Sequence, residues 1–352
     1  MRAIRKMERA PGVTYVANIE KPVCGPDEVL FKVKATAICG TDVSTWRWNE
    51  AGARFADKYE MPCPMTMGHE CCGIIEEIGA NVSGFQVGDR IAIETHIYCG
   101  ECYQCRTGDA HNCQHLKIYG VSCDGCFAEY ATAPASCAYK LPDSVSFEQG
   151  ALFEPAGVAL FGLEESGMKP GDTVMIYGCG PIGQMAIQLA FAYGAGKVIA
   201  VDIQDSRVEQ AKELGAIGVN SIKEDLVSVV KANTGDRGGA DVIIEVSGAS
   251  AVYESMADCL RREGHIMLLA HPGERVSFDV MKTMHHSGAT IKGIFGRRIW
   301  KTWDELTEMV VSGKVDLTKV ITHRFPLSKA QEAFEVIPQG SGKVLFIPEW
   351  ED

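Results

Sequence analysis

The sequence predicts an α/β protein with two domains of different kinds, a small β-barrel and a doubly wound parallel sheet. From residue 28 to about residue 139, short alternating strands are separated by turns rich in Gly, Pro and Asp, which is typical of a compact β domain. From about residue 171 to residue 293, short apolar runs alternate with helix-length amphipathic segments, and this β-α-β spacing indicates a parallel sheet. The length of 352 residues suits two domains.

The expected elements follow from these patterns in chain order. Strands are expected where polar and apolar residues alternate in the barrel, over residues 29–35, 73–78 and 90–93. In the sheet, strands are expected at the apolar runs over residues 173–177, 198–201, 242–246 and 265–269. The patterns also predict helices over residues 184–193, 303–311 and 329–337 and a last strand over residues 344–347. The two patterns meet between residues 153 and 170, where Pro and Gly are frequent, so we expect the domain boundary there.

The composition excludes some classes of function. Acidic residues outnumber Lys and Arg by 46 to 34, and a formal net charge of −12 gives phosphate backbones no electrostatic reason to bind. We therefore expect no nucleic-acid partner. The sequence has no apolar run of 18 residues, and its first residues lack the apolar stretch of a signal peptide, so we expect no membrane partner and a cytoplasmic protein.

Four of the fourteen cysteines lie within 15 residues and predict a metal site. Cys99, Cys102, Cys105 and Cys113 form a C-x-x-C-x-x-C run with a fourth cysteine eight residues later, which supplies the thiolates of a closed tetrahedral zinc site. An iron–sulfur cluster also takes four thiolates, but the C-x-x-x-C-P ending of bacterial ferredoxins is absent, since Gln114 follows Cys113. A closed site predicts a structural zinc rather than a catalytic one.

A second, dispersed set of candidate ligands consists of Cys39, His69, Glu70 and Glu154. Mixed Cys, His and carboxylate ligands suit a catalytic zinc with an exchangeable position. Each residue taken singly also has a structural interpretation: Cys39 as a small buried residue, His69 as a core histidine and Glu154 as a surface charge.

A glycine-rich motif follows the first predicted strand of the sheet. It reads Gly178-Cys179-Gly180-Pro181-Ile182-Gly183 and opens the predicted helix, which is the arrangement that binds the pyrophosphate of a dinucleotide. Asp202, at the end of the next strand, is placed to accept hydrogen bonds from an adenosine ribose, which favours NAD over NADP. Asp202 could instead cap the following helix, and nearby Arg207 could accommodate a 2′-phosphate.

Together these motifs resemble the zinc-containing medium-chain alcohol dehydrogenase family over nearly the whole chain. The motifs that occur in the family's order are Cys39-Gly40-Thr41-Asp42, Gly68-His69-Glu70, Val87-Gly88-Asp89-Arg90, the four-cysteine loop, Phe127-Ala128-Glu129-Tyr130, Glu154-Pro155 and the glycine motif. The resemblance implies a GroES-like catalytic domain with the structural zinc loop over residues 1–154. It further implies a Rossmann NAD-binding domain over residues 155–293, and a segment over residues 294–352 that returns to the catalytic domain.

Within that family the chain most resembles the L-threonine 3-dehydrogenases. The matching segments are Glu94-Thr95-His96-Ile97, Gly293-Ile294-Phe295-Gly296-Arg297, Ile321-Thr322-His323-Arg324-Phe325 and Ser341-Gly342-Lys343-Val344. One segment departs from that branch: residues 156–161 read Ala-Gly-Val-Ala-Leu-Phe, where an Asn and a His are typical. Three hypotheses follow: oxidation of L-threonine; oxidation of a polyol, sugar or cyclitol; or a non-catalytic protein that binds NAD and zinc.

The resemblance also implies the roles of individual residues. Cys39, His69 and a carboxylate would hold the catalytic zinc, with Glu70 and Glu154 either both ligands or exchanging. Hydride would pass from the alcohol substrate to NAD. The Thr41 hydroxyl could relay the released proton, or merely stabilise a turn. His96 would line the substrate pocket, unless it is a loop histidine without such a role. Members of this family usually form homodimers or homotetramers.

Overall fold

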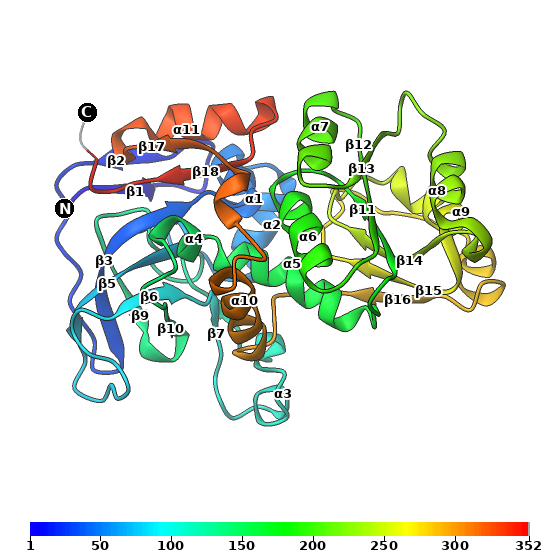
Figure 1. Cartoon of the computed structure of the whole chain (residues 1–352). Coiled ribbons are helices and arrows are strands. Elements are labelled where there is room, and N and C mark those ends of the chain that lie inside the picture. The colour runs from blue at the N-terminus through cyan, green and yellow to red at the C-terminus, as the bar shows by residue number, and fades with distance from the viewer. Residues whose placement is uncertain (351–352) are drawn as a thin grey trace. The chain divides into compact units, whose positions relative to one another are not determined.

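The computed structural model describes residues 1–350, and within them the chain forms two compact units (Figure 1). The first unit contains Met1–Pro155, Arg298–Thr307 and the chain from Leu317 onward. The second unit contains Ala156–Arg297 and Glu308–Asp316.

The first unit is built mainly of antiparallel strands. Its strands are β1 (Ala3–Lys6), β2 (Thr14–Val16), β3 (Glu28–Ala37), β4 (Met65–Thr66), β5 (Glu70–Ile78), β6 (Arg90–Ile93), β7 (His96–Ile97), β8 (Lys117–Ile118), β9 (Tyr130–Pro134), β10 (Ala138–Lys140), β17 (Ile321–Phe325) and β18 (Lys343–Phe346). Its helices are α1 (Gly40–Arg47), α2 (Glu50–Lys58), α3 (Tyr103–Arg106), α4 (Phe147–Ala151) and α11 (Ala330–Val336), while α10 (Lys301–Val311) begins in this unit.

The main sheet of this unit has the order β10-β6-β5-β3-β18-β17, with β9 also paired to β3. The C-terminal strand β18 pairs with β3, so that Leu345 lies opposite Ala37, and β3 pairs with β5, so that Ala37 lies opposite Glu70. Aromatic rings such as Phe127 and Phe346, whose centroids lie 5.2 Å apart, fill the apolar core. The sheet therefore brings the chain's end beside residues that are far away in sequence.

The second unit is a parallel sheet covered by helices. Its strands are β11 (Thr173–Tyr177), β12 (Lys197–Asp202), β13 (Ile217–Asn220), β14 (Ala240–Glu245), β15 (Leu260–Leu268) and β16 (Thr290–Gly293). Its helices are α6 (Pro181–Ala192), α7 (Asp205–Glu213), α8 (Leu226–Thr234) and α9 (Val252–Cys259). The order β13-β12-β11-β14-β15-β16, with every pair parallel, is that of the Rossmann fold and reverses between β11 and β14. The predicted α/β fold class is confirmed.

The Pro- and Gly-rich stretch between residues 153 and 170 begins with a continuous helix, α5 (Phe153–Glu165). Pro155 stands in its first turn, where a missing amide hydrogen costs no helical bond. Gly157 and Gly162 allow close packing, since a Cβ on Gly157 would lie 2.7 Å from the Arg297 side chain and one on Gly162 would lie 3.0 Å from Leu269.

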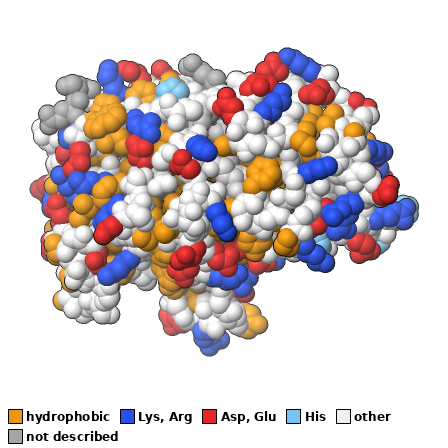
Figure 2. Space-filling view, viewed as in Figure 1, with side chains coloured by type: hydrophobic (Ala, Val, Ile, Leu, Met, Phe, Trp, Pro, Cys, Tyr) orange, Lys and Arg blue, Asp and Glu red, His pale blue; other side chains and the backbone are white. Residues whose placement is uncertain are grey.

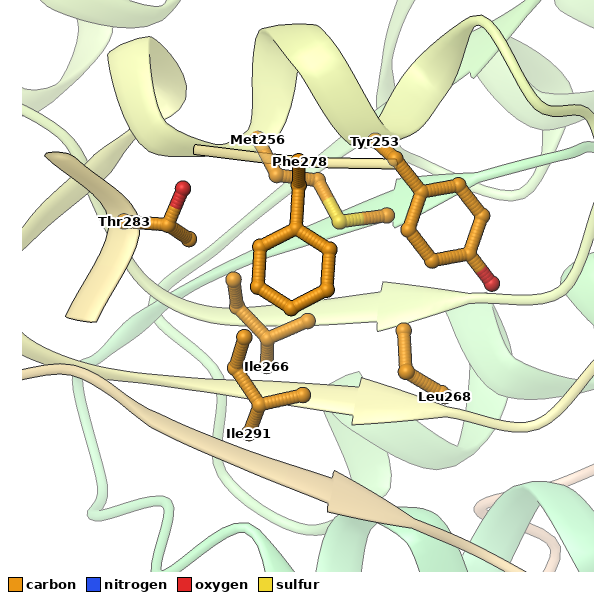
Figure 3. Close-up of a pocket in the computed structure, with 7 residues that line it drawn as sticks. All are labelled: Tyr253, Met256, Ile266, Leu268, Phe278, Thr283 and Ile291. Atoms are coloured by element: carbon orange, nitrogen blue, oxygen red, sulfur yellow. The ribbon is translucent and has the colours of Figure 1, made fainter. Parts of the chain in front are cut away.

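A small apolar pocket lies between α9 and the strands β15 and β16 of the second unit (Figure 3). Its lining is apolar apart from the hydroxyl groups of Tyr253 and Thr283, and Phe278 lies over Ile266 and Ile291. On the face seen in Figure 2, acidic and basic side chains are interspersed among neutral ones. Of the helices within residues 1–350, none is long and apolar enough to cross a membrane.

Candidate metal and nucleotide sites

The four clustered cysteines converge in the loop around α3. The Sγ atom of Cys102 lies 3.5 Å from that of Cys105 and 3.8 Å from that of Cys113, and Cys99 Sγ lies 3.5 Å from Cys113 Sγ. All four sulfur atoms lie within 4.8 Å of one another. This spacing and the four-thiol donor set fit one tetrahedral zinc ion.

Backbone amides are directed at these sulfur atoms. The Cys102 amide donates to Cys99 Sγ at 3.4 Å, and the amides of Cys99 and His115 donate to Cys113 Sγ at 3.4 and 3.3 Å. Hydrogen bonds from the backbone amides of Cys105 and Gln114 lower the pKa of Cys102 to about 6. Burial and the neighbouring Cys102 thiol raise the pKa of Cys105 to about 12. Backbone hydrogen bonds lower the pKa of Cys99 as well, so the loop favours thiolates at two of its four cysteines.

Three of the four dispersed candidates also converge. Cys39 is the N-cap of α1, and His69 and Glu70 stand where the chain enters β5. The ligand atoms of Cys39, His69 and Glu70 lie within 4.8 Å of one another. Gly68 makes this approach possible, because its φ is +95° and a Cβ there would lie 2.2 Å from the Phe127 ring. His69 and Glu70 are buried.

Asp42 supports the first two of these residues. Its Oδ2 accepts a hydrogen bond of 2.9 Å from the Cys39 amide, and its Oδ1 lies 3.6 Å from Nδ1 of His69. Burial lowers the pKa of His69, but the negative charges of Asp42 and Cys39 raise it by more, so that it lies well above its ordinary value. His69 is thus surrounded by negative charge, as suits a position next to a cation.

Glu70 has a buried partner that the sequence interpretation missed. Lys343 Nζ, on β18, donates to Glu70 Oε1 at 2.6 Å, contacts Oε2 as well, and donates to the Ile38 carbonyl at 3.1 Å. Burial lowers the pKa of Lys343, but the Glu70 carboxylate raises it by more. Lys343 was visible in the sequence only as part of a family motif, since nothing local in the sequence pairs it with a residue 273 positions earlier.

The remaining three candidates are Glu154, Thr41 and His96. Glu154 is 8% exposed and lies outside the group within 4.8 Å, but its negative charge is among those that raise the pKa of His69. Its Oε1 accepts a hydrogen bond of 3.0 Å from Thr95 Oγ1. The hydroxyl of Thr41, on α1, is buried and has no hydrogen-bond partner among the described residues. His96, on β7, is buried beside Glu94.

In the second unit, the glycine motif connects β11 to α6. Gly178 has a φ of +101°, and a Cβ on Gly183 would lie 1.8 Å from the Gly178 carbonyl oxygen, so both positions require glycine. Gly180 is the N-cap of α6, and the nearest atom to a Cβ there would be Arg207 Nη1 at 4.0 Å. Pro181 and Ile182 form the first turn of the helix. The open space at this helix N-terminus fits a pyrophosphate.

Asp202 ends β12 beside this turn. Its Oδ2 accepts a hydrogen bond of 2.9 Å from the Cys179 amide, and its Oδ1 accepts bonds from the amides of Ile203 and Gln204. The N-cap of α7 is Gln204, so the alternative in which Asp202 caps this helix is wrong. A carboxylate offers about four acceptor sites, so three amides leave capacity for a ribose hydroxyl. Arg207 Nη1 lies 3.8 Å from Asp202 Oδ2.

Comparison with known proteins identifies the chain's relatives. Residues 25–143 match the alcohol dehydrogenase GroES-like domain, and residues 181–312 match the zinc-binding dehydrogenase domain. The chain is 41% identical over 351 residues to an L-threonine 3-dehydrogenase of Caldanaerobacter subterraneus subsp. tengcongensis, covering 99% of each chain. It is 42% identical to an L-threonine 3-dehydrogenase of Pyrococcus abyssi, covering 99% of this chain and 98% of the relative. The chain belongs to the zinc-containing medium-chain alcohol dehydrogenase family.

A solved structure agrees with this membership. The 2R,3R-butanediol dehydrogenase of Bacillus subtilis is 29% identical, with a TM-score of 0.89 over 99% of both chains. The resemblance inferred from the motifs is therefore confirmed, and so is the pairing of a GroES-like domain with a Rossmann domain. As a member of the medium-chain alcohol dehydrogenases, the chain is an oxidoreductase that acts on an alcohol, which excludes the hypothesis of a non-catalytic binding protein.

Proposed function

We propose that the chain is a zinc- and NAD-dependent L-threonine 3-dehydrogenase. In this reaction the secondary alcohol of L-threonine is oxidised to the ketone of 2-amino-3-oxobutanoate, while NAD takes up the hydride to give NADH and one proton is released. The observation that carries the proposal is the full-length similarity to proteins of that name, at 41% and 42% identity. The cluster of partly exposed Cys39 and buried His69 and Glu70 supplies the ligands that such a reaction needs.

Cys39 and His69 would hold the catalytic zinc together with a carboxylate. Zinc bound there would act as a Lewis acid that polarises the substrate's hydroxyl group. Glu70 faces the cluster but is also held by Lys343, whereas Glu154 lies just outside the group, which suits two carboxylates that exchange as ligand. Thr41 would relay the proton of the substrate hydroxyl: its own hydroxyl, which is buried without a partner among the described residues, would take up that proton as it passes its own proton on toward solvent.

The four-cysteine loop would hold a second, structural zinc. Four thiolates leave no position for substrate, so this zinc would stabilise the loop rather than take part in the reaction. The small-molecule substrate would therefore bind at the Cys39 cluster and not at the four-cysteine loop. We further propose, as is usual in this family, that the chain assembles as a homodimer or homotetramer.

NAD would bind at Gly178, Gly180 and Gly183, with Asp202 on the adenosine ribose. Bound NAD supplies the hydride acceptor. The negative charge of Asp202 would repel the 2′-phosphate of NADP, whereas Arg207, which lies 3.8 Å from Asp202, would attract it. Replacing Asp202 with Ala should weaken NAD binding by about tenfold and leave NADP binding less affected. An unchanged ratio of the two dissociation constants would remove Asp202 from this role.

A polyol substrate is the second candidate. Residues 156–161 favour it, because they replace polar residues typical of threonine dehydrogenases with apolar ones, and Ala156, Ala159 and Leu160 are fully buried in helix α5. The decisive experiment measures NADH formation by zinc-replete protein with L-threonine beside sorbitol, inositol and 2,3-butanediol. Turnover of threonine well above the polyols is expected. Turnover of a polyol without threonine would refute the proposal while leaving the family membership intact.

A further inference from the structure

Glu245 is a buried carboxylate that the proposed chemistry leaves without a role. It is the last residue of β14, where it pairs with Tyr177 on β11 and with Leu268 on β15. The residue is 0% exposed, and its Oε2 is buried with no hydrogen-bond partner among the described residues. A buried acceptor without a donor lowers the stability of the folded state. Stability alone therefore does not explain a carboxylate at this position.

The other oxygen of Glu245 holds the turn that follows β14, which we call the Ser247 turn (residues 246–249). Oε1 accepts hydrogen bonds from the amide of Ser247 at 2.7 Å, from the hydroxyl of Ser247 at 2.6 Å and from the amide of Gly248 at 2.9 Å. The Ser247 hydroxyl also accepts a hydrogen bond of 3.1 Å from the amide of Ala249. A single carboxylate oxygen thus fixes both the backbone and the side chain of this turn.

The Ser247 turn packs between the glycine motif and the segment that follows β15. A Cβ on Gly178 would lie 3.0 Å from both the N and the Cα atoms of Ser247, so these two backbones are in close contact. A Cβ on Gly248 would lie 3.0 Å from the carbonyl oxygen of His271. Ser247 itself is exposed, whereas the Glu245 that holds it is buried. A shift of the turn would therefore change the surface next to the glycine motif.

The place of the turn in the sheet indicates which half of the cofactor it would contact. The strand order reverses between β11 and β14, and a dinucleotide binds across the carboxyl ends of the strands at such a point. Asp202, the proposed acceptor for the adenosine ribose, ends β12 on one side of β11, while the Ser247 turn follows β14 on the other side. With the adenosine half on the β12 side, the nicotinamide half would extend over β14.

We infer that Glu245 is a positioning residue for the nicotinamide half of NAD, because its Oε1 holds the Ser247 turn against Gly178 as one wall of that half of the site. This inference rests on the proposed function, since it assumes that NAD binds at the glycine motif. The unpaired Oε2 suits this role, because functional sites keep residues that lower stability when those residues hold a needed geometry.

The first test measures cofactor binding and needs no turnover. Full-length protein is titrated by calorimetry with NADH and with AMP, which has the adenosine half and lacks the nicotinamide half. Glu245→Leu removes the acceptor of the turn, and the Kd for NADH should rise at least about tenfold, as expected when several hydrogen bonds that fix a binding surface are lost. The Kd for AMP should change by less than about twofold. An unchanged Kd for NADH would overturn the inference.

Three further variants test whether the acceptor itself is responsible. Glu245→Gln keeps an oxygen that can accept from the turn, so the Kd for NADH should stay within about threefold of wild type. Ser247→Ala removes only the hydroxyl of an exposed residue and should raise the Kd for NADH by about two- to tenfold, with AMP unaffected. Asp258→Asn, which removes a surface partner of Lys282 in the same unit, is the matched control and should change neither Kd.

A melting experiment separates positioning from folding. In Glu245→Leu the lost hydrogen bonds are offset by removal of the unpaired buried oxygen, so the melting temperature should lie within about 3 °C of wild type. Equal losses of NADH and AMP affinity would mean general damage to the site and would overturn the assignment to the nicotinamide half. If Glu245→Leu does not fold, Ser247→Ala decides, and an unchanged Kd for NADH in that variant would overturn the inference.

The outcomes also separate this inference from the proposed function. A wild-type protein that binds neither NADH nor AMP would refute the proposed NAD site and, with it, the role of Glu245. A wild-type protein that binds NADH and does not oxidise threonine would refute the proposed substrate alone. The ratio of NADH to AMP affinity in Glu245→Leu would then still decide whether Glu245 positions the nicotinamide half.

Discussion

The two cysteine-containing clusters of the first unit are built in opposite ways. The sulfur atoms of Cys99, Cys102, Cys105 and Cys113 come from one short loop, and backbone amides of the same loop donate to them. The Cys39 cluster draws its ligand atoms from two separate segments, and two of its three residues, His69 and Glu70, are buried. Its supporting partners come from α1 and from the C-terminal strand β18.

Because of this difference, we expect the four-cysteine loop to contribute to the stability of the protein and the Cys39 cluster to contribute to the reaction. Four thiolates from one loop can hold that loop around a metal ion without affecting the rest of the fold. An interior cluster needs the whole sheet to form, because each buried charge must find a partner from a distant strand. We therefore expect damage to the loop to lower stability with little direct effect on the reaction, and damage to the interior cluster to stop the reaction.

The largest effect should come from Cys39→Ser. Loss of a thiolate ligand removes the polarisation of the substrate, which contributes several kcal/mol, so kcat/KM should fall at least about 10³-fold. The protein should lose bound zinc, measured by atomic absorption, with little change in melting temperature. Wild-type activity together with full zinc content would place the catalytic metal elsewhere.

Lys343→Met should give the largest loss of stability. The change leaves the Glu70 carboxylate buried without its cation, and breaking a buried pair in this way costs about 3–5 kcal/mol. Urea unfolding should detect this loss. The double variant Lys343→Met with Glu70→Gln should recover most of it, because no unpaired charge remains. If the double variant were as unstable as the single one, packing rather than charge would explain the effect.

Cys102→Ser should lower stability without affecting the reaction directly. We expect a melting temperature lower by about 5 °C from loss of the loop zinc, measured by calorimetry. Below that temperature, kcat/KM should stay within about threefold of wild type. A loss of activity as large as that of Cys39→Ser would show that the two clusters are not separable.

The smallest effect distinguishes individual cysteines within the loop. After mild chelation at pH 7, iodoacetamide should modify Cys102 at least about tenfold faster than Cys105, because only the thiolate reacts. The lowered pKa of about 6 keeps Cys102 ionised above that pH, and its rate should fall as the pH drops through 6. Cys105, with a pKa of about 12, stays protonated throughout. Peptide mapping that finds the two equally modified would contradict this order.

Much of the architecture followed from local patterns. The strand over residues 90–93 has the predicted bounds, and so does that over residues 173–177. The predicted strand over residues 73–78 begins earlier, at Glu70, because Glu70 pairs with Ala37 and not because of any alternation in its own sequence. The helix over residues 153–165 was hidden by its Pro and Gly residues, and the close packing of Gly157 on Arg297 and of Gly162 on Leu269 is visible only in the folded chain.

By itself the sequence determined the features that depend on neighbours in the chain. These are the strand and helix periodicities, the four-cysteine loop and the Gly178 turn, since each is governed by contacts over a few residues. Only the tertiary structure decided which distant groups share one interior. The structure places Lys343 against Glu70 and Trp303 against Glu94. A buried charge or N–H donor needs a hydrogen-bond partner, and the packing of strands and helices determines which distant residue supplies it.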